Sequence, residues 1–231
     1  MQPNANTIQA EVNNALATIL QENIETNGSG RTDSGVHAKE QVFHCDLNIT
    51  ISTDELVRKM NGLLPNDIVV NKIFEVKDEA HARYNAISRS YEYHILFNRS
   101  PFGSAEHYFT HKKPDFKLMN KACKLLIGKQ DFTSFSKVKT EVNNFFCDIS
   151  KAEWQFSEEK ATFYVTANRF LRGMVRALVG TLLNVGYGTI SLEEFKNIIS
   201  AKDRSQAGQS VPPQGLYLCD VRYPEELFNK L

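Results

Sequence analysis

Residues 28–38 read GSGRTDSGVHA and place an arginine and an aspartate in the most turn-prone stretch of the chain. The stretch holds three glycines and no large apolar side chain before Val36. Arg31 and Asp33 are costly to bury unless they are paired, so their position needs a reason. One interpretation is a turn in which Asp33 binds nearby backbone while the glycines supply positive φ angles. The other is a loop that presents a reactive carboxylate.

Two common functions of glycine-rich loops do not fit this stretch. A phosphate-binding loop ends in Gly-Lys followed by Ser or Thr, and that ending is missing here. A calcium loop needs several carboxylates, whereas this loop has one. The sequence therefore indicates neither a nucleotide triphosphate site nor a metal site.

Composition predicts a folded protein with one large domain or two small ones, since 42% of the 231 residues are hydrophobic. Basic and acidic residues number 27 each, so the net charge is zero and any nucleic-acid surface must be local. The apolar runs are shorter than the roughly 18 residues of a membrane span, and no signal-peptide pattern is seen. We expect no membrane association and a cytoplasmic location. The four scattered cysteines form no C-x-x-C pair and are interpreted as reduced, mostly buried thiols.

Helical and strand patterns alternate along the chain, which predicts an α+β fold. Capping boxes at Asn6 with Gln9, Ser52 with Glu55, and Ser191 with Glu194 open three of the helices. The predicted helices run to about residue 22, from about 53, over 115–127, over 170–185 and from about 192. The predicted strands cover 41–49, 67–76, 87–97, 145–156, 161–167 and 215–223. The segment YFTHKKPDFK (108–117) is the predicted linker between an N-terminal half, 1–107, and a C-terminal half, 108–231.

Three arginines fall on one side of the helix predicted within NRFLRGMVRALVG (168–180). At about 100° per residue, Arg169, Arg172 and Arg176 lie within about 60° of one another. The ordinary interpretation is the solvated face of an amphipathic helix. The alternative is a ligand site, because Gly173 and Gly180 border the arginines and would let a phosphate or carboxylate approach the backbone.

The stretch GRTDSGVHA (30–38) resembles the signature loop of the tRNA pseudouridine synthases of the TruA family, in which the aspartate is catalytic. Other segments match in the family's order: QPNANTIQ (2–9), HARYNAISRSYEY (81–93), DFTSF (131–135), ANRFLRGMVRALVG (167–180) and GLYLCDVRYP (215–224). The resemblance covers essentially the whole chain. It implies the pseudouridine synthase fold: two similar halves, each with a mixed or antiparallel sheet and helices packed on one face. It also implies that tRNA is the partner and that the protein is a homodimer.

The implied reaction is the isomerisation of uridine to pseudouridine in the anticodon stem-loop, with no cofactor and no metal. The enzyme would break the bond from ribose to N1 of uracil, turn the base and rejoin the ribose to C5. Asp33 would act as nucleophile at C1′ or as base at C2′. By resemblance, Arg176 is the cation that pairs with Asp33.

Tyr91 has two interpretations. On periodicity alone it shares a strand face with Tyr93 and Ile95, which predicts an ordinary core tyrosine. Its place in SRSYEY resembles the family's active-site tyrosine, which would stack on the flipped uracil or assist removal of the C5 proton. The resemblance favours the second interpretation.

Substrate binding is assigned to Arg31, Arg169, Arg172 and Tyr91. A loop-stabilising ion pair is an equal alternative for Arg31. The basic and aromatic run YFTHKK (108–113) is a further candidate for RNA contact. The histidines at positions 37, 44 and 81 have no role implied by the resemblance and are interpreted as structural.

One departure from the family pattern concerns the start of the chain. Family members begin with a strand that carries an Asp-Gly turn, followed by Gly-Trp-Gln just before the segment that matches residues 2–4, whereas the one tryptophan here is Trp154. We therefore expect the first strand of the N-terminal sheet to be missing. A catalytically impaired tRNA-binding remnant is the alternative function, and a glycosidase that releases uracil is a third.

Overall fold

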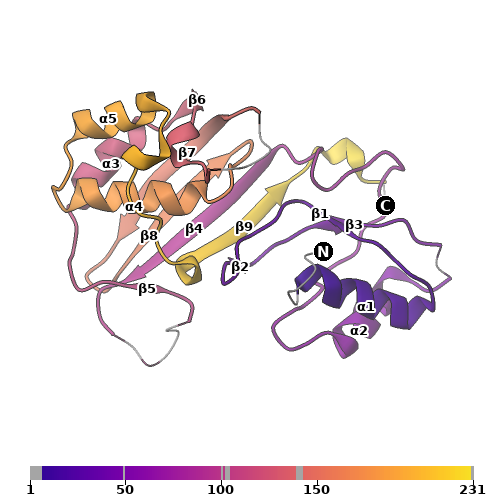
Figure 1. The fold of residues 1–231 in the computed structure, drawn as a ribbon. Coiled ribbons are helices and arrows are strands. Elements are labelled where there is room, and N and C mark those ends of the chain that lie inside the picture. Colours follow the sequence, from indigo (N-terminus) through magenta and orange to yellow (C-terminus); the bar gives the residue numbers. More distant parts are fainter. Residues whose placement is uncertain (1–6, 49, 100, 102–104, 139–142, 230–231) are drawn as a thin grey trace. The chain divides into compact units, whose positions relative to one another are not determined.

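The computed structural model describes residues 7–48, 50–99, 101, 105–138 and 143–229, and the predicted α+β class is confirmed (Figure 1). The chain folds into two compact units, each made from separate stretches of sequence. The first comprises Met1–Arg31, Val42–Ala86 and Tyr223–Leu231. The second comprises Thr32–Gln41 and Ile87–Arg222.

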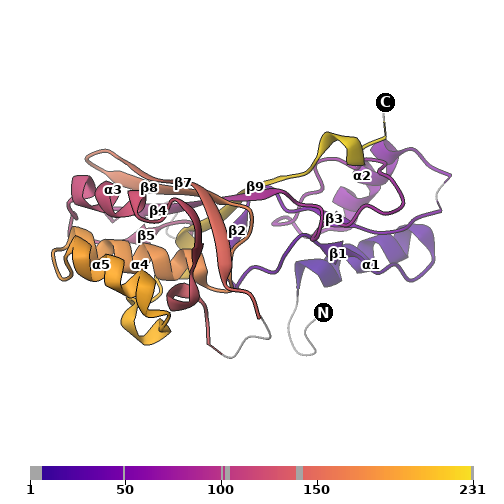
Figure 2. The same ribbon diagram turned by 90° about the horizontal axis from the view of Figure 1, so that it is seen from above.

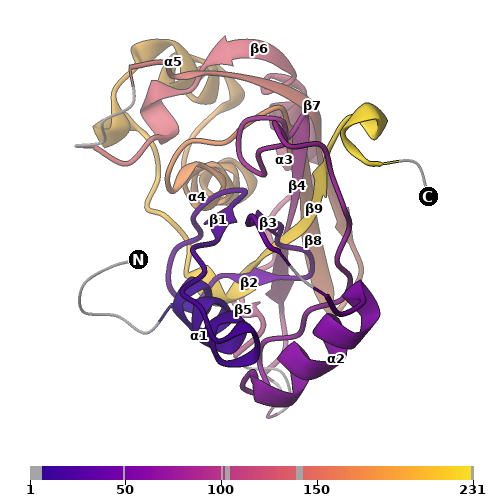
Figure 3. The same cartoon turned by 90° about the vertical axis from the view of Figure 1, so that its right-hand side faces the viewer.

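The first unit is built on α1 (Ile8–Leu20) and α2 (Thr53–Leu63), which lie side by side (Figure 3). The hydroxyl of Ser52 accepts a hydrogen bond from the Glu55 amide, so the predicted start of α2 is confirmed. The cap of α1 is Thr7, while the predicted cap Asn6 lies outside the described residues. The core of this unit consists of Val12, Ala15, Leu16, Leu56, Met60, Leu64 and Val70.

Strands are short in the described part of the first unit. The predicted strand at 41–49 is reduced to β3 (Phe43–His44), which pairs antiparallel with β1 (Asn27–Gly28). Of the predicted strand at 67–76, Val76 alone forms a bridge, to Phe228. A run of apolar residues favours a strand, but a strand also needs a neighbour that shares its backbone hydrogen bonds. The strand predictions were therefore wrong for most of these two segments.

The second unit carries a seven-stranded mixed sheet in the order β2-β9-β4-β8-β7-β6, with β5 paired to β4. Its strands are β2 (His37–Ala38), β4 (Ser88–Leu96), β5 (Tyr108–Phe109), β6 (Gly128–Asp131), β7 (Phe146–Phe156), β8 (Lys160–Ala167) and β9 (Leu216–Arg222). The pairs β2–β9 and β4–β5 are parallel, and the others are antiparallel. The division predicted between residues 107 and 108 falls inside this unit, because β4 and β5 on either side of it are hydrogen-bonded.

The helices of the second unit are α3 (Phe116–Lys124), α4 (Met174–Gly186) and α5 (Leu192–Ala201), and α4 and α5 lie on one side of the sheet (Figure 2). The capping box of Ser191 and Glu194 at the start of α5 is confirmed. Short 3-10 turns occur at η1 (Thr133–Phe135), η2 (Arg204–Gln206) and η3 (Pro213–Gly215), and in the first unit at η4 (Glu225–Leu227). Helices and strands share one core, whose fully buried members include Tyr93, Ile95, Phe163, Leu178 and Phe195.

The start of α4 differs from the prediction and changes the interpretation of the arginines. Gly173 has a φ angle of +72°, a left-handed conformation that stops a helix from extending back through it. Arg169 and Arg172 therefore precede α4, and Arg176 alone of the three lies on the helix. The predicted helical stripe of three arginines was wrong.

Gly180 permits a close approach, but to the chain's own backbone. A Cβ atom at this position would lie 1.9 Å from the carbonyl oxygen of Gln209. The segment after η2 therefore crosses α4 at Gly180, and the space that we had predicted for a ligand is filled by Gln209.

Candidate active site

The loop that contains Asp33 is a tight turn joined to the sheet of the second unit. The Val36 amide donates to the Asp33 carbonyl oxygen at 3.1 Å and closes the turn. Gly35 has a φ angle of +78°, and a Cβ atom there would lie 3.1 Å from Cγ of Pro213. Both the conformation and the space at position 35 therefore require glycine. After the turn, β2 pairs with β9 in the register His37 with Tyr217.

Arg176 reaches the Asp33 carboxylate from the first turn of α4. Its Nη1 atom lies 2.9 Å from Oδ2 of Asp33, and its Nε donates to the carbonyl oxygen of Val211 at 2.7 Å. The two side chains are 20% and 30% exposed, so the ion pair is partly shielded but open to a ligand. A guanidinium bound at two points has a fixed direction, and this direction orients the carboxylate. The pairing implied by the family resemblance is therefore present in the structure.

Tyr91 lies on β4, and its ring meets the ring of Phe170 edge-on at a centroid distance of 5.1 Å. Burial raises the pKa of the Tyr91 hydroxyl to about 12; Arg89 opposes the shift, and the negative charge of Asp33 adds to it. Asp33 therefore lies close enough to Tyr91 for its charge to act on the hydroxyl. At neutral pH the hydroxyl keeps its proton.

The segment from Val211 to Pro213 supports this site, and nothing in the sequence had marked it as functional. The Val211 carbonyl holds Arg176, the Pro212 carbonyl accepts the Tyr93 hydroxyl at 2.8 Å, and Pro213 packs on the glycine of the Asp33 loop. Pro212 and Pro213 restrict the backbone of this segment, and this pair was the one sequence feature that could have indicated a rigid support. Phe170 was also missed as an individual residue, although it lies inside a segment that resembles the family.

In the part of the second unit that the structure describes, we find no contact that joins Arg169 or Arg172 to Asp33. The Arg172 carbonyl accepts from the Lys137 amide, and the Arg172 side chain is exposed. Arg169 is half-buried and lies close enough to Cys147 to oppose the rise in its thiol pKa. Arg31 belongs to the first unit. Their substrate-binding roles stay predictions.

The cysteines are free thiols, as predicted; Cys123 and Cys147 are buried, and Cys45 and Cys219 are half-buried. Burial raises the pKa of the Cys123 thiol to about 12 and that of Cys147 to about 11, which makes them poor nucleophiles at neutral pH. Within the ranges that the structure describes, we find no group of three histidine, cysteine or acidic side chains that could hold a metal ion. No helix in these ranges has the length and apolar character needed to cross a membrane.

Comparison with known proteins places the chain in a family. A family model described as tRNA pseudouridine synthase matches residues 122–224. The chain is 47% identical over 232 residues to tRNA pseudouridine synthase A of Parabacteroides distasonis. The match covers 99% of this chain and 91% of that protein. Proteins of the same name from Bacteroides fragilis and Bacillus subtilis are 45% and 39% identical, with 99% and 96% of this chain and 92% of each relative covered. The chain belongs to the tRNA pseudouridine synthase A family.

Proposed function

We propose that this protein isomerises uridine to pseudouridine in the anticodon stem-loop of tRNA, with Asp33 as the reacting group. The observation that carries the proposal is the ion pair of Asp33 and Arg176, which orients a carboxylate in a loop beside Tyr91 in a member of this family. The proposal includes a homodimer, a cytoplasmic location and no cofactor.

The chemistry assigned to Asp33 follows from its pairing. Arg176 binds Oδ2, so Oδ1 is the atom proposed to attack C1′ of the ribose or to take a proton from C2′. Either route releases N1 of uracil while the base stays in the site. The base then turns, and C5 forms the new bond to C1′ as the bond to Asp33 breaks on the first route, or as C2′ regains its proton on the second. The hydrogen on C5 leaves as a proton, and N1 takes one up, so the product is an isomer of the substrate.

Tyr91 is proposed to hold the uracil ring. With a pKa of about 12, roughly one hydroxyl in 10⁵ is ionised at pH 7, which makes it an inefficient proton acceptor. Its raised pKa therefore favours stacking and hydrogen bonding to the turned base over direct removal of the C5 proton. Arg169, Arg172 and Arg31 are proposed to bind tRNA phosphates.

The first experiment uses tRNA transcripts tritiated at uracil C5 and counts the tritium released to water. We expect release by the unmodified chain, loss of release in Asp33→Asn, and little change in tRNA affinity. Asp148→Asn, on the exposed side of β7, is the matched control and should retain activity.

Product analysis separates the proposal from its alternatives. The proposed reaction gives an isomer of unchanged mass. Free uracil would show a glycosidase, and bound but unaltered tRNA would show the binding remnant. A loss of affinity in Asp33→Asn as large as the loss of rate would overturn the role assigned to this carboxylate.

A further inference from the structure

His37 lies four residues after Asp33, in the short strand that ends the Asp33 loop. It is the register partner of Tyr217 in the parallel pairing of β2 with β9. The two rings stack with a centroid distance of 4.7 Å and an interplanar angle of 18°. Successive residues of a strand face opposite sides, so Tyr217 lies on the other side of β9 from the buried Leu216 and Leu218.

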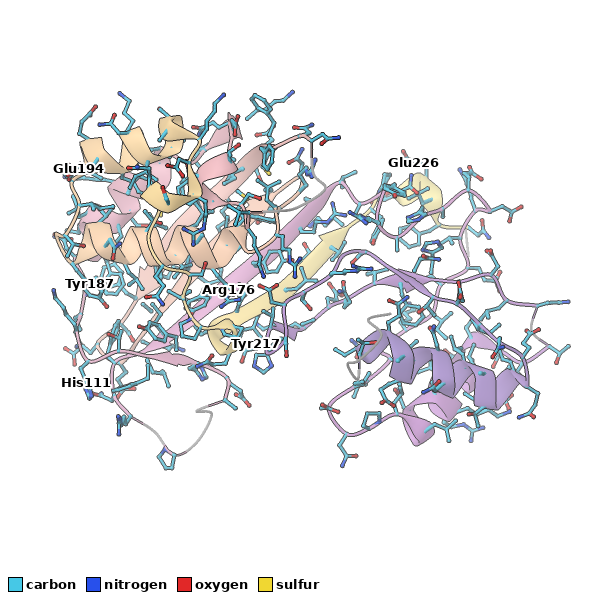
Figure 4. All side chains as sticks on the ribbon, viewed as in Figure 1. His111, Arg176, Tyr187, Glu194, Tyr217 and Glu226 are labelled. Carbon is cyan, nitrogen blue, oxygen red and sulfur yellow. The ribbon has the colours of Figure 1, made fainter. Side chains whose placement is uncertain are left out.

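The Tyr217 ring is fixed from several sides. Its hydroxyl donates to the Glu106 carbonyl at 2.9 Å, and the His94 ring meets it edge-on at 4.8 Å. His37 has its own second contact, between Nε2 and the Ala105 carbonyl at 3.1 Å. The stacked pair therefore joins the end of the Asp33 loop to β9, to β4 and to residues 105–106. Figure 4 labels Tyr217 near the start of β9 and Arg176 between β9 and α4.

The backbone joins this loop end to β9 over a short length, through the two residues of β2 and a bond from the Lys39 amide to the Leu218 carbonyl at 2.8 Å. A ring stacked on a fixed partner restricts the loop at low entropic cost, since an aromatic side chain has few rotatable bonds. A displacement of about 1 Å at a reacting group can reduce a rate about 100-fold. Helix α4, which carries Arg176, packs on the side of the sheet that Leu216 faces. The stack of His37 and Tyr217 lies on the other side, so it acts from outside the site.

We propose that His37 is a positioning residue, which holds the Asp33 loop in its reactive geometry through the face of its ring stacked on Tyr217. This inference rests on the proposed function, because it concerns the rate of the reaction assigned to Asp33. Its ring nitrogens take no part in the reaction. A flat aromatic side chain at position 37 should largely replace it, because the stack on Tyr217 is kept and the contact with Ala105 alone is lost.

The test compares His37→Phe with His37→Ala in the tritium-release assay with saturating tRNA. We expect kcat to fall about 10- to 100-fold in His37→Ala and to stay within about threefold of the unmodified value in His37→Phe. The tRNA dissociation constant should stay within about twofold in both variants. The double variant with Tyr217→Ala should be no slower than the slower single variant, because either change breaks the same stack.

Tyr164→Ala is the matched control. Tyr164 and Tyr217 both lie opposite Glu92, on either side of β4, and the Tyr164 ring packs with Lys151 of β7. It should retain full activity. A kcat for His37→Phe as low as that for His37→Ala would overturn the proposal, and so would full activity in His37→Ala. Absence of release by the unmodified chain would instead overturn the proposed function, so the two failures are distinguishable.

Discussion

Arg176 binds two partners with one guanidinium group: Nη1 lies 2.9 Å from the Asp33 carboxylate, and Nε lies 2.7 Å from the Val211 carbonyl. The second bond gives the side chain a fixed direction from α4, so the first can orient the carboxylate. The Asp33 loop is thereby linked to a residue of α4 that lies 143 positions later in the chain.

Arg176→Lys should lower kcat about tenfold or more, because an ammonium group cannot reproduce the planar two-point geometry. Arg176→Gln, which also removes the charge, should lower it further. Tritium release at saturating tRNA measures both variants.

Arg204→Lys is the control for this prediction. Arg204 also donates to a carbonyl, that of Ala207, and to the Ser210 hydroxyl, but its contacts serve the fold. It should cost about 1 kcal/mol of stability and leave kcat unchanged. An equal loss of kcat in Arg204→Lys and Arg176→Lys would contradict a specific role for Arg176.

Tyr91→Phe keeps the ring that packs on Phe170 and removes the hydroxyl. If the hydroxyl binds the turned uracil, kcat should fall about 10- to 100-fold while tRNA affinity is retained. The pH–rate profile of the unmodified protein should show no step from this hydroxyl up to pH 10, because its pKa is about 12. Full activity in Tyr91→Phe would limit the residue to stacking.

The same hydroxyl predicts a loss of stability at high pH. Its pKa is about 12 in the folded protein and 10.0 without the shift, so the folded state keeps a proton that the unfolded state releases above pH 10. The contribution of this hydroxyl to the free energy of unfolding is constant below pH 10. Above pH 10 the free energy of unfolding falls by about 1.4 kcal/mol per pH unit towards pH 12. Urea titrations of Tyr91→Phe should show a shallower decline. Identical slopes in the two proteins would contradict the shift.

The sequence predicted local features better than distant ones. Ser52 and Ser191 were recognised as helix caps because each bonds to an amide three residues away. The start of α4 was missed because the left-handed conformation of Gly173 is invisible in a pattern that otherwise continues through it. In the same way, the apolar residues at 67–76 predicted a strand, but they could not supply a pairing neighbour, and Val69 and Phe74 are exposed.

For the site, only the resemblance linked Asp33 with Arg176, since no spacing rule relates residues so far apart. The Val211 carbonyl could not be predicted at all, because every residue carries such a group and its use depends on tertiary structure. His37 was interpreted as structural because the resemblance implied no role for it. Its partner ring, Tyr217, lies 180 positions later and is met only when β2 and β9 pair.

Gly180→Ala should destabilise the second unit by about 2 kcal/mol or more, because the new Cβ would lie 1.9 Å from the Gln209 carbonyl. The gain in helix propensity, about 1 kcal/mol, is smaller than this clash. Gly62→Ala in α2 is the control, since a Cβ there meets nothing within 4 Å, and it should stabilise the first unit by about 0.5–1 kcal/mol. Thermal and urea unfolding measure both. A higher stability of Gly180→Ala would contradict this prediction, because it would show that the segment around Gln209 shifts away from the new Cβ at little cost in free energy.

Arg172→Ala tests the proposed phosphate contact outside the reacting site. The side chain is exposed and precedes α4, so its removal should leave kcat at saturating tRNA unchanged. A variant that lacks one phosphate contact releases about one counterion fewer when it binds tRNA. The slope of log affinity against log salt concentration should therefore become shallower by about 0.7–0.9. Affinity at low salt should fall several-fold. Lys196→Ala, on the exposed side of α5, is the control of equal charge and should leave the slope unchanged. An unaltered slope in Arg172→Ala would assign the arginine to the solvated surface, because a contact that binds phosphate must change the salt dependence.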